Sequence, residues 1–402
     1  MKLLKLLIAA AVLLHGFAAA QIAVKGETVY TMNGTPIANG VVLIKNGKIE
    51  KVGAEKDVKI PADYQVLSGK IVTPGLIDAH SVVGLAGMYN QRHDQDQLDK
   101  TNAIQPELRA LDAYNARDEL IEWLRDYGIT TVHTGHAPGA LVSGQSIIVK
   151  TTGETVEESL IDSSAMLTMT LGATVGRNFK SPGTRAKGMA MLRSDFLKAQ
   201  EYRKKMSAKE KDKAPARDLK MEALAAALDG KLPVLITAQK APEIMSALRL
   251  AREFGLNLVL DGAAEAYLLL DEIKAAGVPV IVHPTMARNY GDTQNAAFDT
   301  AFKLKSAGIP FAFQSGYESY VPKTRVALFE AGVAAGNGLS RDDALRALTI
   351  DAANILGIQS RVGSLEKGKD ADVVIFDGDP LEYLSKVCAV IINGKIIHQT
   401  CR

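Results

Sequence analysis

Charge of one sign, cysteine and long apolar runs are all scarce in this 402-residue chain. The 47 Lys and Arg residues nearly balance the 45 Asp and Glu residues, which leaves a formal net charge of +2. The densest basic stretch, 203–213, is interleaved with Glu210 and Asp212, which is typical of a solvated helix face. The composition therefore indicates no nucleic-acid partner.

The longest apolar run lies at the start of the chain. Lys2 and Lys5 precede an apolar run over 6–14, and three alanines at 18–20 follow it. The run is shorter than the roughly 20 residues that span a bilayer, and His15 follows it, which argues against the alternative of a membrane anchor. No cysteine follows the alanines, so a lipid has no attachment point. We expect residues 1–20 to be removed as a signal peptide, giving an exported protein, periplasmic or secreted, with no stable membrane anchor.

Cys388 and Cys401 are the only cysteines, and Asn393-Gly394 between them is typical of a tight hairpin turn. A two-residue turn there pairs Cys388 with Gln399 and leaves Cys401 two residues further along on the same face. In the oxidising compartment that export implies, the pair forms a disulfide if the backbone adjusts; two free thiols are the alternative. A cysteine pair alone does not indicate a metal site.

Short β-rich runs occupy both ends of the chain. Near the N-terminus, four such runs lie between Ala23 and Val72, and Asn46-Gly47 joins the middle two as a hairpin. The C-terminal segment 371–397 repeats this character. We therefore predict one small β domain built from both chain ends, residues 21–73 and 362–402.

Residues 74–361 alternate apolar strand-like runs with helical patterns. Most of the eight candidate strands are too apolar for a sheet with one wet face, which favours an α/β fold, a closed parallel (β/α)8 barrel of the TIM type. An open doubly wound sheet is the alternative, but no G-x-G-x-x-G loop follows any strand. The predicted strands cover 75–80, 130–134, 146–150, 165–171, 232–238, 257–260, 278–282 and 309–313, and the predicted helical regions cover 184–228, 241–254, 263–276, 295–307 and 323–335.

Two motifs at the ends of this region are distinctive. Residues 73–80 read Thr-Pro-Gly-Leu-Ile-Asp-Ala-His, and residues 363–374 read Gly-Ser-Leu-Glu-Lys-Gly-Lys-Asp-Ala-Asp-Val-Val. The first resembles the PGLIDxHxH motif of the amidohydrolase superfamily, most closely of its imidazolonepropionase-like branch. The second, with the helical segment 348–357 before it, resembles that family's return into its β domain. The resemblance spans nearly the whole chain after residue 20, and it implies the fold more firmly than the chemistry.

The resemblance also implies a metal site that this chain has largely lost. In the family, two histidines of the first strand, histidines ending strands five and six, and an aspartate ending strand eight hold one or two metals, which activate a bound water. Here His80 stands at the first position. The remaining positions carry Val82, then Thr237 and Gln239, then Asp261 or Gly262, and finally Gly316. This set implies at most one divalent metal, zinc, manganese or iron, near His80, and no metal is the alternative.

Other polar residues at predicted strand ends could compensate for the missing ligands. His133 and His136 follow the second strand at the end where barrel enzymes keep their chemistry, and His283 ends the seventh. Ordinary loop or core histidines are the alternative for all three. The loop 92–99 has carboxylates at a spacing of two that could hold a hard cation, although it lacks a calcium loop's glycine and distal glutamate; a solvated polar loop is the alternative.

These observations predict a hydrolase of C–N bonds in small amides, cyclic amides or dipeptides. We expect His80 and Asp261 to lie closest to any metal or activated water, with His133, His136 or His283 as acid and base groups near neutral pH.

The alternative is a catalytically inactive barrel retained as a binding or assembly protein, because Val82 and Gly316 have no side chain that can bind a metal. The resemblance also suggests a homodimer. The substrate itself is not predicted, because specificity in this fold resides in the loops that follow the strands.

Overall fold

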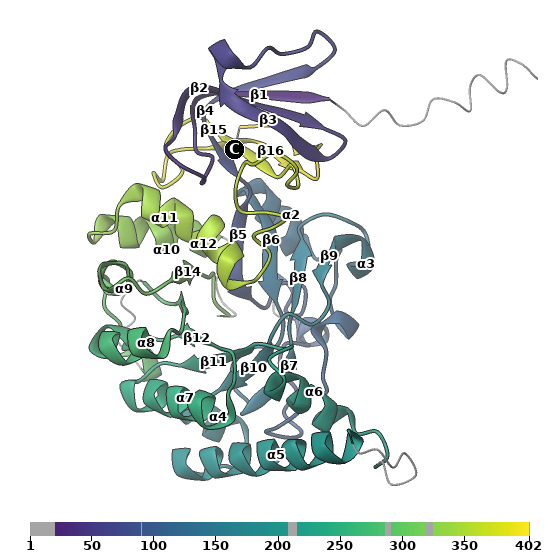
Figure 1. The fold of residues 1–402 in the computed structure, drawn as a ribbon, viewed down its shortest axis with the longest axis vertical. Helices are drawn as coiled ribbons and strands as arrows, with labels where there is room; N and C mark the ends of the chain where they lie inside the picture. Colours follow the sequence, from purple (N-terminus) through teal and green to yellow (C-terminus); the bar gives the residue numbers. More distant parts are fainter. Residues whose placement is uncertain (1–20, 90, 208–214, 286–290, 318–324, 402) are drawn as a thin grey trace, which may run out of the picture.

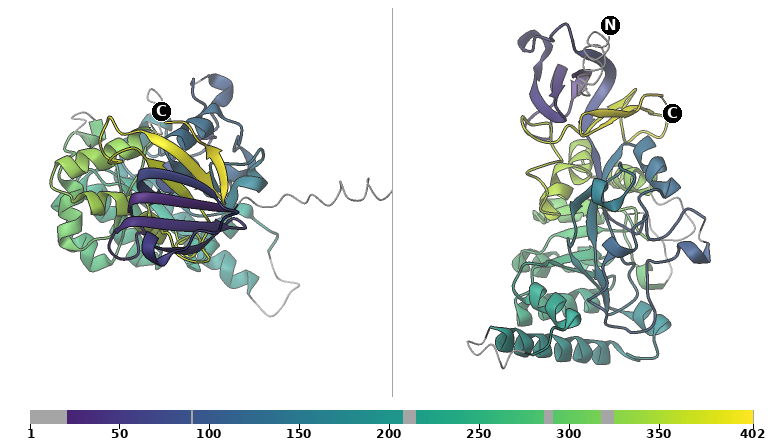
Figure 2. Two further views of the ribbon diagram at one scale, coloured as in Figure 1. Left: turned by 90° about the horizontal axis from the view of Figure 1, so that it is seen from above. Right: turned by 90° about the vertical axis from the view of Figure 1, so that its right-hand side faces the viewer.

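The computed structural model describes residues 21–89, 91–207, 215–285, 291–317 and 325–401. A seven-stranded sheet lies at one end of a larger α/β body, and helix α5 (Arg185–Met206) lies at the opposite end of that body (Figures 1 and 2). The predicted signal peptide falls on residues 1–20, outside the described residues. Within the described ranges, no helix combines the length and apolar character needed to cross a bilayer.

The seven-stranded sheet contains strands from both ends of the chain. Its order is β17-β16-β15-β4-β1-β2-β3, so β4 has β1 on one side and the C-terminal strand β15 on the other. Asn46-Gly47 and Asn393-Gly394 form the two predicted tight turns, and all four residues have positive φ, as this turn type requires. The strands are β1 (Ile22–Val29), β2 (Ile37–Lys45), β3 (Lys48–Ala54), β4 (Gln65–Pro74), β15 (Val373–Phe376), β16 (Val387–Ile392) and β17 (Lys395–His398).

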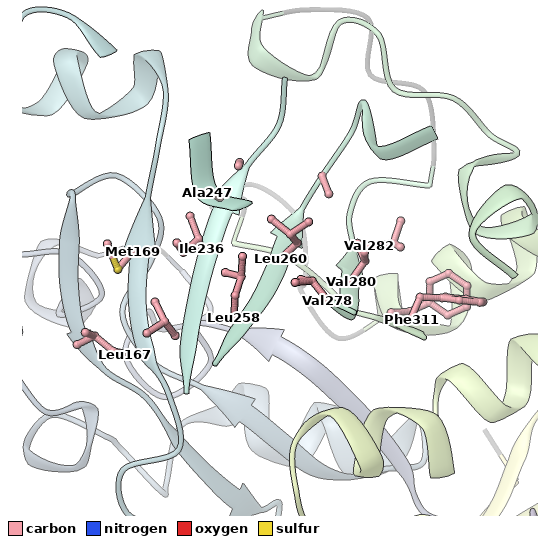
Figure 3. Packing of buried hydrophobic residues seen from close by; sticks show 14 of the residues in the cluster. Leu167, Met169, Ile236, Ala247, Leu258, Leu260, Val278, Val280, Val282 and Phe311 are labelled. Atoms are coloured by element: carbon pink, nitrogen blue, oxygen red, sulfur yellow. The ribbon is translucent and has the colours of Figure 1, made fainter. Parts of the chain in front are cut away.

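The α/β body contains a ladder of five parallel strands. They follow one another in the sheet order β10 to β14, and their alternate side chains pack with Ala247 of α7 in a buried apolar layer (Figure 3). Strands β5 and β6 are also parallel and belong to a second sheet. The strands are β5 (Leu76–Ser81), β6 (Ile129–Thr134), β7 (Val142–Gln145), β8 (Ile147–Lys150), β9 (Leu160–Asp162), β10 (Leu167–Thr170), β11 (Val234–Ala238), β12 (Leu258–Gly262), β13 (Val280–Val282) and β14 (Phe311–Phe313).

The body departs from the predicted closed parallel barrel in two ways. The predicted third strand, 146–150, corresponds to β8, which runs antiparallel to β6, while the adjoining β7 runs antiparallel to β10. On the other side, β14 and β5 meet through an isolated bridge between Ser81 and Gly316. The described strands of the α/β body therefore form two sheets that the ladders do not join into a closed barrel.

Helices flank the strands where the sequence pattern predicts them. The predicted helix 241–254 corresponds to α7 with the same ends, whereas the long region 184–228 contains two helices, α5 and α6, on either side of residues outside the described ranges. Among the described residues, the helices of four or more residues are α2 (Glu119–Asp126), α3 (Val156–Ser159), α4 (Ala173–Asn178), α5, α6 (Leu219–Leu228), α7 (Ala241–Phe254), α8 (Leu270–Ala276), α9 (Thr300–Ala307), α10 (Arg325–Gly336), α11 (Arg341–Ala347) and α12 (Ile350–Ile355).

A buried lysine joins the α/β body to the seven-stranded sheet. The Lys150 Nζ atom, at the end of β8, lies 2.5 Å from Asp372 Oδ2 and 3.1 Å from Asp370 Oδ2, and it donates to Asn393 Oδ1 at 2.9 Å. The side chains of Lys150, Asp370 and Asp372 are at most 4% exposed. Burial raises the pKa of Asp372 despite the nearby lysine, whereas Lys48, Lys150 and Arg361 outweigh burial and lower the pKa of Asp370 to about 2.

Cys388 and Cys401 form a disulfide, as one of the two alternatives predicted. A register shift in the β16–β17 pairing places His398 opposite Val390, one residue later than a regular two-residue hairpin would. This shift brings Cys401 toward Cys388, and their Cα atoms are 3.8 Å apart.

Replacing both cysteines by serine should lower the free energy of unfolding by about 3 kcal/mol, because the bond restricts a short loop in the unfolded chain. The two residues are separated by 13 positions. Urea unfolding checks this with the oxidised protein, the same protein under dithiothreitol, and the Cys388→Ser, Cys401→Ser variant. The last two should coincide; equal stability of all three would contradict the prediction.

Candidate functional site

A buried histidine and aspartate face each other at the carboxyl ends of two strands. His80 lies near the end of β5 and Asp261 near the end of β12; their side chains are 1% and 0% exposed. His80 Nδ1 and Asp261 Oδ1 are 2.9 Å apart. The His80 Nε2 atom is buried and has no hydrogen-bond partner among the described residues. The carboxylate at Nδ1 holds the His80 ring in one orientation. The unpartnered Nε2 atom is then able to bind a proton or a ligand.

Two further side chains hold Asp261 in place. Thr237 is paired with Asp261 in the β11–β12 register, and its hydroxyl donates to Asp261 Oδ2 at 2.5 Å. Gln314, just after β14, donates from Nε2 to Asp261 Oδ1 at 2.6 Å. Burial opposes the ionisation of Asp261, but His80 and these two donors outweigh burial and lower its pKa. Asp261 is therefore a carboxylate at neutral pH, and both of its oxygens accept hydrogen bonds.

His133 lies beside this pair, and both of its ring nitrogens form hydrogen bonds within the protein. Its ring centroid is 5.6 Å from that of His80. Its Nδ1 atom is 2.7 Å from the Ala79 carbonyl oxygen, and its Nε2 atom is 2.6 Å from Ser146 Oγ. Burial lowers the pKa of His133 to about 3. Because His133 is neutral and both nitrogens are bonded, it supports the position of β5 better than it transfers protons.

His283 and His80 both lie near the ring of Tyr317. The Tyr317 ring centroid is 6.1 Å from that of His80 and 6.0 Å from that of His283. His283 Nδ1 is 3.5 Å from Glu330 Oε1, and both side chains are at most 2% exposed. Gln239 Nε2 donates to the Tyr317 hydroxyl at 3.3 Å. His80 and His283 thus share one aromatic neighbour, Tyr317.

His136 is not part of this cluster. No hydrogen bond, ion pair or ring contact joins it to His80 or Asp261 within the described part of the chain. The side chain is 4% exposed and lines a separate cavity, and both ring nitrogens lack a hydrogen-bond partner. The predicted acidic loop 92–99 borders the same cavity through Asp96 and Asp99. The structure thus brings together His80, Asp261, His133 and His283 but places His136 elsewhere.

Sequence reasoning missed three residues of this arrangement: Gln314, Tyr317 and Glu330. Gln314 and Tyr317 follow the end of β14, the position where a polar residue after an apolar strand is the expected signal. Glu330 lies on α10, where its neighbours give a helical pattern and nothing marks it as buried. Its carboxylate accepts hydrogen bonds from the backbone N–H and the hydroxyl of Thr285, two residues after His283.

An α/β body that carries polar side chains at the carboxyl ends of its strands, next to a small sheet from both chain ends, is the architecture of an amidohydrolase, and this resemblance supports a hydrolase of C–N bonds. Residues 91–398 match the model of the Amidohydrolase family, and this match covers more than half of the chain. The chain belongs to the amidohydrolase family.

Relatives and solved structures are consistent with this assignment. The crystal structure of an amidohydrolase from Thermotoga maritima MSB8 is 31% identical, with a TM-score of 0.88 over 94% of this chain and 100% of that one. An imidazolonepropionase from Fusobacterium nucleatum is 24% identical over 89% of this chain and 91% of its own length. The amidohydrolase tasK of Hapsidospora irregularis is 24% identical, and this chain spans 39% of its length. A prolidase complexed with N-methylphosphonate-L-proline, 17% identical with a TM-score of 0.59, shares the fold.

The residues present do not fit the metal site that this family generally carries. Among the described residues, no group of three or more His, Cys, Asp or Glu side chains could hold a metal. Both oxygens of Asp261 are engaged by His80, Thr237 and Gln314. The Gln314 amide presents its N–H donors where a cation would need a lone pair. The carboxylate of Asp261 is thus already held in a hydrogen-bond network, and Val82, directly after β5, is a buried apolar side chain that cannot bind a metal.

Asp78 lies on β5 two residues before His80 and is also buried. Its Oδ1 atom accepts hydrogen bonds from the backbone N–H groups of Ser315 at 3.0 Å and His80 at 3.3 Å. Burial raises the pKa of Asp78 to about 6, even though these hydrogen bonds favour the charged form.

The variant Asp78→Asn should be more stable than the wild type above pH 6, by on the order of 1–3 kcal/mol. The folded state holds the Asp78 proton more tightly than the unfolded state, so wild-type stability falls as pH rises from about 4 to about 6. The gain should therefore be small near pH 4 and constant above pH 6. Urea unfolding at pH 4.5, 6 and 8 measures it, with the exposed Asp299→Asn as control. An equal difference at all three pH values would contradict the prediction.

Proposed function

We propose that this protein hydrolyses C–N bonds in small amides, cyclic amides or dipeptides with His80 as its general base and without a metal. The observation that carries the proposal is the His80–Asp261 pair: one ring nitrogen is held by a carboxylate at 2.9 Å, and the other is buried without a partner. In catalytic pairs of this kind, a carboxylate orients the histidine base, and the other nitrogen of the histidine faces the reacting atoms.

The proposed step uses a neutral His80. Its Nδ1–H donates to Asp261, so the lone pair on Nε2 accepts a proton from water while the water oxygen attacks the carbonyl carbon. Asp261 stabilises the imidazolium that forms, and the proton then passes to the departing nitrogen as the C–N bond breaks. Thr237 and Gln314 keep the Asp261 carboxylate in the orientation that selects this tautomer of His80. His283 and Tyr317 lie close enough to help position the substrate.

The relatives, among which are imidazolonepropionases, and the prolidase that shares the fold support the proposed substrate class. The test is a turnover screen of cyclic amides, simple amides and dipeptides, run on protein whose metal content has been measured before and after treatment with a chelator. Turnover that persists in metal-free protein supports the proposal. Turnover that appears only with added zinc, manganese or iron would refute the metal-free step.

A second candidate is a catalytically inactive binding or assembly protein. The observation in its favour is the burial of the pair: His80 is 1% exposed and Asp261 is 0% exposed, with both carboxylate oxygens already bonded. Absence of turnover across the whole panel, together with saturable binding of one of its compounds, would favour this candidate over the hydrolase.

We further propose that the protein acts outside the cytoplasm, in a periplasm or after secretion, and that it works as a homodimer. The Cys388–Cys401 disulfide supports the first point, because structural disulfides persist mainly in oxidising compartments. Cell fractionation and light scattering, respectively, test the two points.

A further inference from the structure

A lysine, an asparagine and an aspartate meet where the α/β body joins the seven-stranded sheet. Lys150 Nζ donates to Asn393 Oδ1 at 2.9 Å and lies 2.5 Å from Asp372 Oδ2. The Asn393 Cγ atom is therefore within about 4 Å of Nζ, because a C=O bond is about 1.2 Å long. Asp372 Oδ1 accepts the backbone N–H of Asn393 at 2.9 Å. An amine, a carboxamide and a carboxylate are thus held in mutual contact.

The surroundings of this group favour proton transfer from the lysine to Asp372. The Lys150 and Asp372 side chains are 2% and 4% exposed, so they are shielded from water. Asp370, the other carboxylate beside Lys150, is also paired with Lys48 at 2.6 Å and Arg361 at 3.0 Å. Burial raises the pKa of Asp372, so this carboxylate takes up a proton more readily than an exposed aspartate. Because buried charges are costly, a neutral amine beside a neutral acid is an accessible state.

The turn that carries Asn393 fixes its carboxamide beside the lysine. Asn393 and Gly394 have φ values of 51° and 72°, as a tight Asn-Gly turn requires. In Asn-Gly sequences the glycine nitrogen can itself attack the carboxamide and form a cyclic imide. Here the Gly394 N–H donates to the Ala371 carbonyl oxygen at 2.9 Å, which holds that nitrogen in the backbone hydrogen bond. The lysine amine is therefore the better placed nucleophile.

We propose that Lys150 and Asn393 form an isopeptide bond after the chain has folded, which joins the α/β body covalently to the seven-stranded sheet. The ion pair and the hydrogen bond of the structure are the arrangement before the reaction. The two residues are 243 positions apart, so only the folded chain brings them together. Holding the reacting groups in contact supplies much of the rate, as in other intramolecular reactions. The bond is independent of the proposed hydrolysis at His80.

The step needs no oxidant, reductant or other reactant. The Lys150 ammonium gives a proton to Asp372 Oδ2, and the lone pair freed on Nζ attacks Asn393 Cγ. The carbonyl electron pair moves to Oδ1 and returns as the bond between Cγ and Nδ2 breaks. Asp372 passes both protons lost by Nζ to Nδ2, which leaves as ammonium. One ammonium group and one carboxamide thus become one secondary amide and one ammonium ion, and Asp372 ends as it began.

Peptide mapping by tandem mass spectrometry tests the proposal on the purified protein, both fresh and after long incubation at pH 8. Trypsin does not cleave after an acylated lysine, so the bond joins peptide 126–177 to peptide 387–395 once the disulfide is reduced. We expect this branched peptide, lighter by one ammonia than the sum of its parts, to increase with incubation. Mapping is needed because cyclisation at an Asn-Gly sequence or at an N-terminal glutamine also releases ammonia.

Three variants identify the reacting groups. Asn393→Gly removes the carboxamide at a positive φ that glycine adopts readily, so it should fold and give no branched peptide. Asn46→Gly makes the same change in the other Asn-Gly turn, where φ is 53°, and should leave the bond unchanged. Asp372→Asn should slow bond formation at least tenfold, because it removes the group that carries the protons.

Folded wild-type protein that gives no branched peptide after incubation would overturn the proposal. Ammonia loss that maps only to cyclised asparagine or glutamine would do the same. A branched peptide that persists in Asn393→Gly would place the bond at another residue, and an unchanged rate in Asp372→Asn would overturn the proton transfer through Asp372.

Discussion

Replacing Lys150 by methionine should lower the free energy of unfolding by about 3–5 kcal/mol at neutral pH. The methionine retains most of the apolar length of the lysine but removes the ammonium group that lies 2.5 Å from Asp372 and 3.1 Å from Asp370. Asp372 is then left buried without its cation, and a lone buried charge is far less stable than a paired one. Urea unfolding at pH 7.5 measures the change.

Two comparisons separate this effect from a general loss of packing. Lys205→Met, on the exposed side of α5, should change stability by no more than about 0.5 kcal/mol. Adding Asp372→Asn to Lys150→Met should restore part of the loss, because the unpaired charge is removed. The loss should also shrink at acid pH, because the pKa of Asp372 is already raised and its carboxylate becomes neutral. A loss below about 1 kcal/mol in Lys150→Met would contradict the proposed role of this ion cluster.

Asp261→Asn should lower kcat/KM by about 10³- to 10⁴-fold on any amide that the wild type hydrolyses. An asparagine presents an N–H group to His80 Nδ1 in place of the carboxylate, so the proton moves to Nε2 and the lone pair needed for water activation is lost. The measurement is kcat/KM as a function of pH, because Asp261→Asn should be impaired at every pH. A variant that only loosens the fold should instead be less stable and have a higher KM.

Asp299→Asn, at an aspartate whose side chain is 43% exposed, should leave kcat/KM unchanged. A folded Asp261→Asn protein that keeps more than a tenth of wild-type kcat/KM would rule out His80–Asp261 as the catalytic pair. His80→Gln should be at least as impaired as Asp261→Asn, because it removes the base itself.

Much of the secondary structure follows from local sequence, and α7 shows why. Its apolar residues recur at helical spacing, Pro242 stands in its first turn and Gly255 ends it in the left-handed region, so the pattern and both end signals agree. The direction of β8 could not be predicted in the same way. A short apolar run is equally suited to either direction, and only its neighbours β6 and β9 determine that it is antiparallel.

The candidate site was predictable in part. The resemblance at residues 73–80 pointed to His80, and the strand-end position pointed to Asp261; the structure places them 2.9 Å apart. Gln314 could not be assigned, because its contact with Asp261 depends on the offset between β12 and β14 across β13, which no local pattern encodes. His136 shows that a strand-end position in the sequence does not fix where a side chain lies. Its position after β6 resembles that of a site residue, but the loop after the strand directs it into a different cavity.

The placement of β4 between β1 and β15 has a consequence for biosynthesis. During synthesis, strand β4 is made early, whereas β15 is made after almost all of the α/β body. The contact between Lys48 and Asp370, for example, joins residues that are 322 positions apart in the sequence. Until β15 emerges, one edge of β4 has no partner and can pair with any other extended chain. A nascent chain is therefore exposed to aggregation at this edge, and a holdase that shields residues 65–74 would protect the chain until β15 has been made.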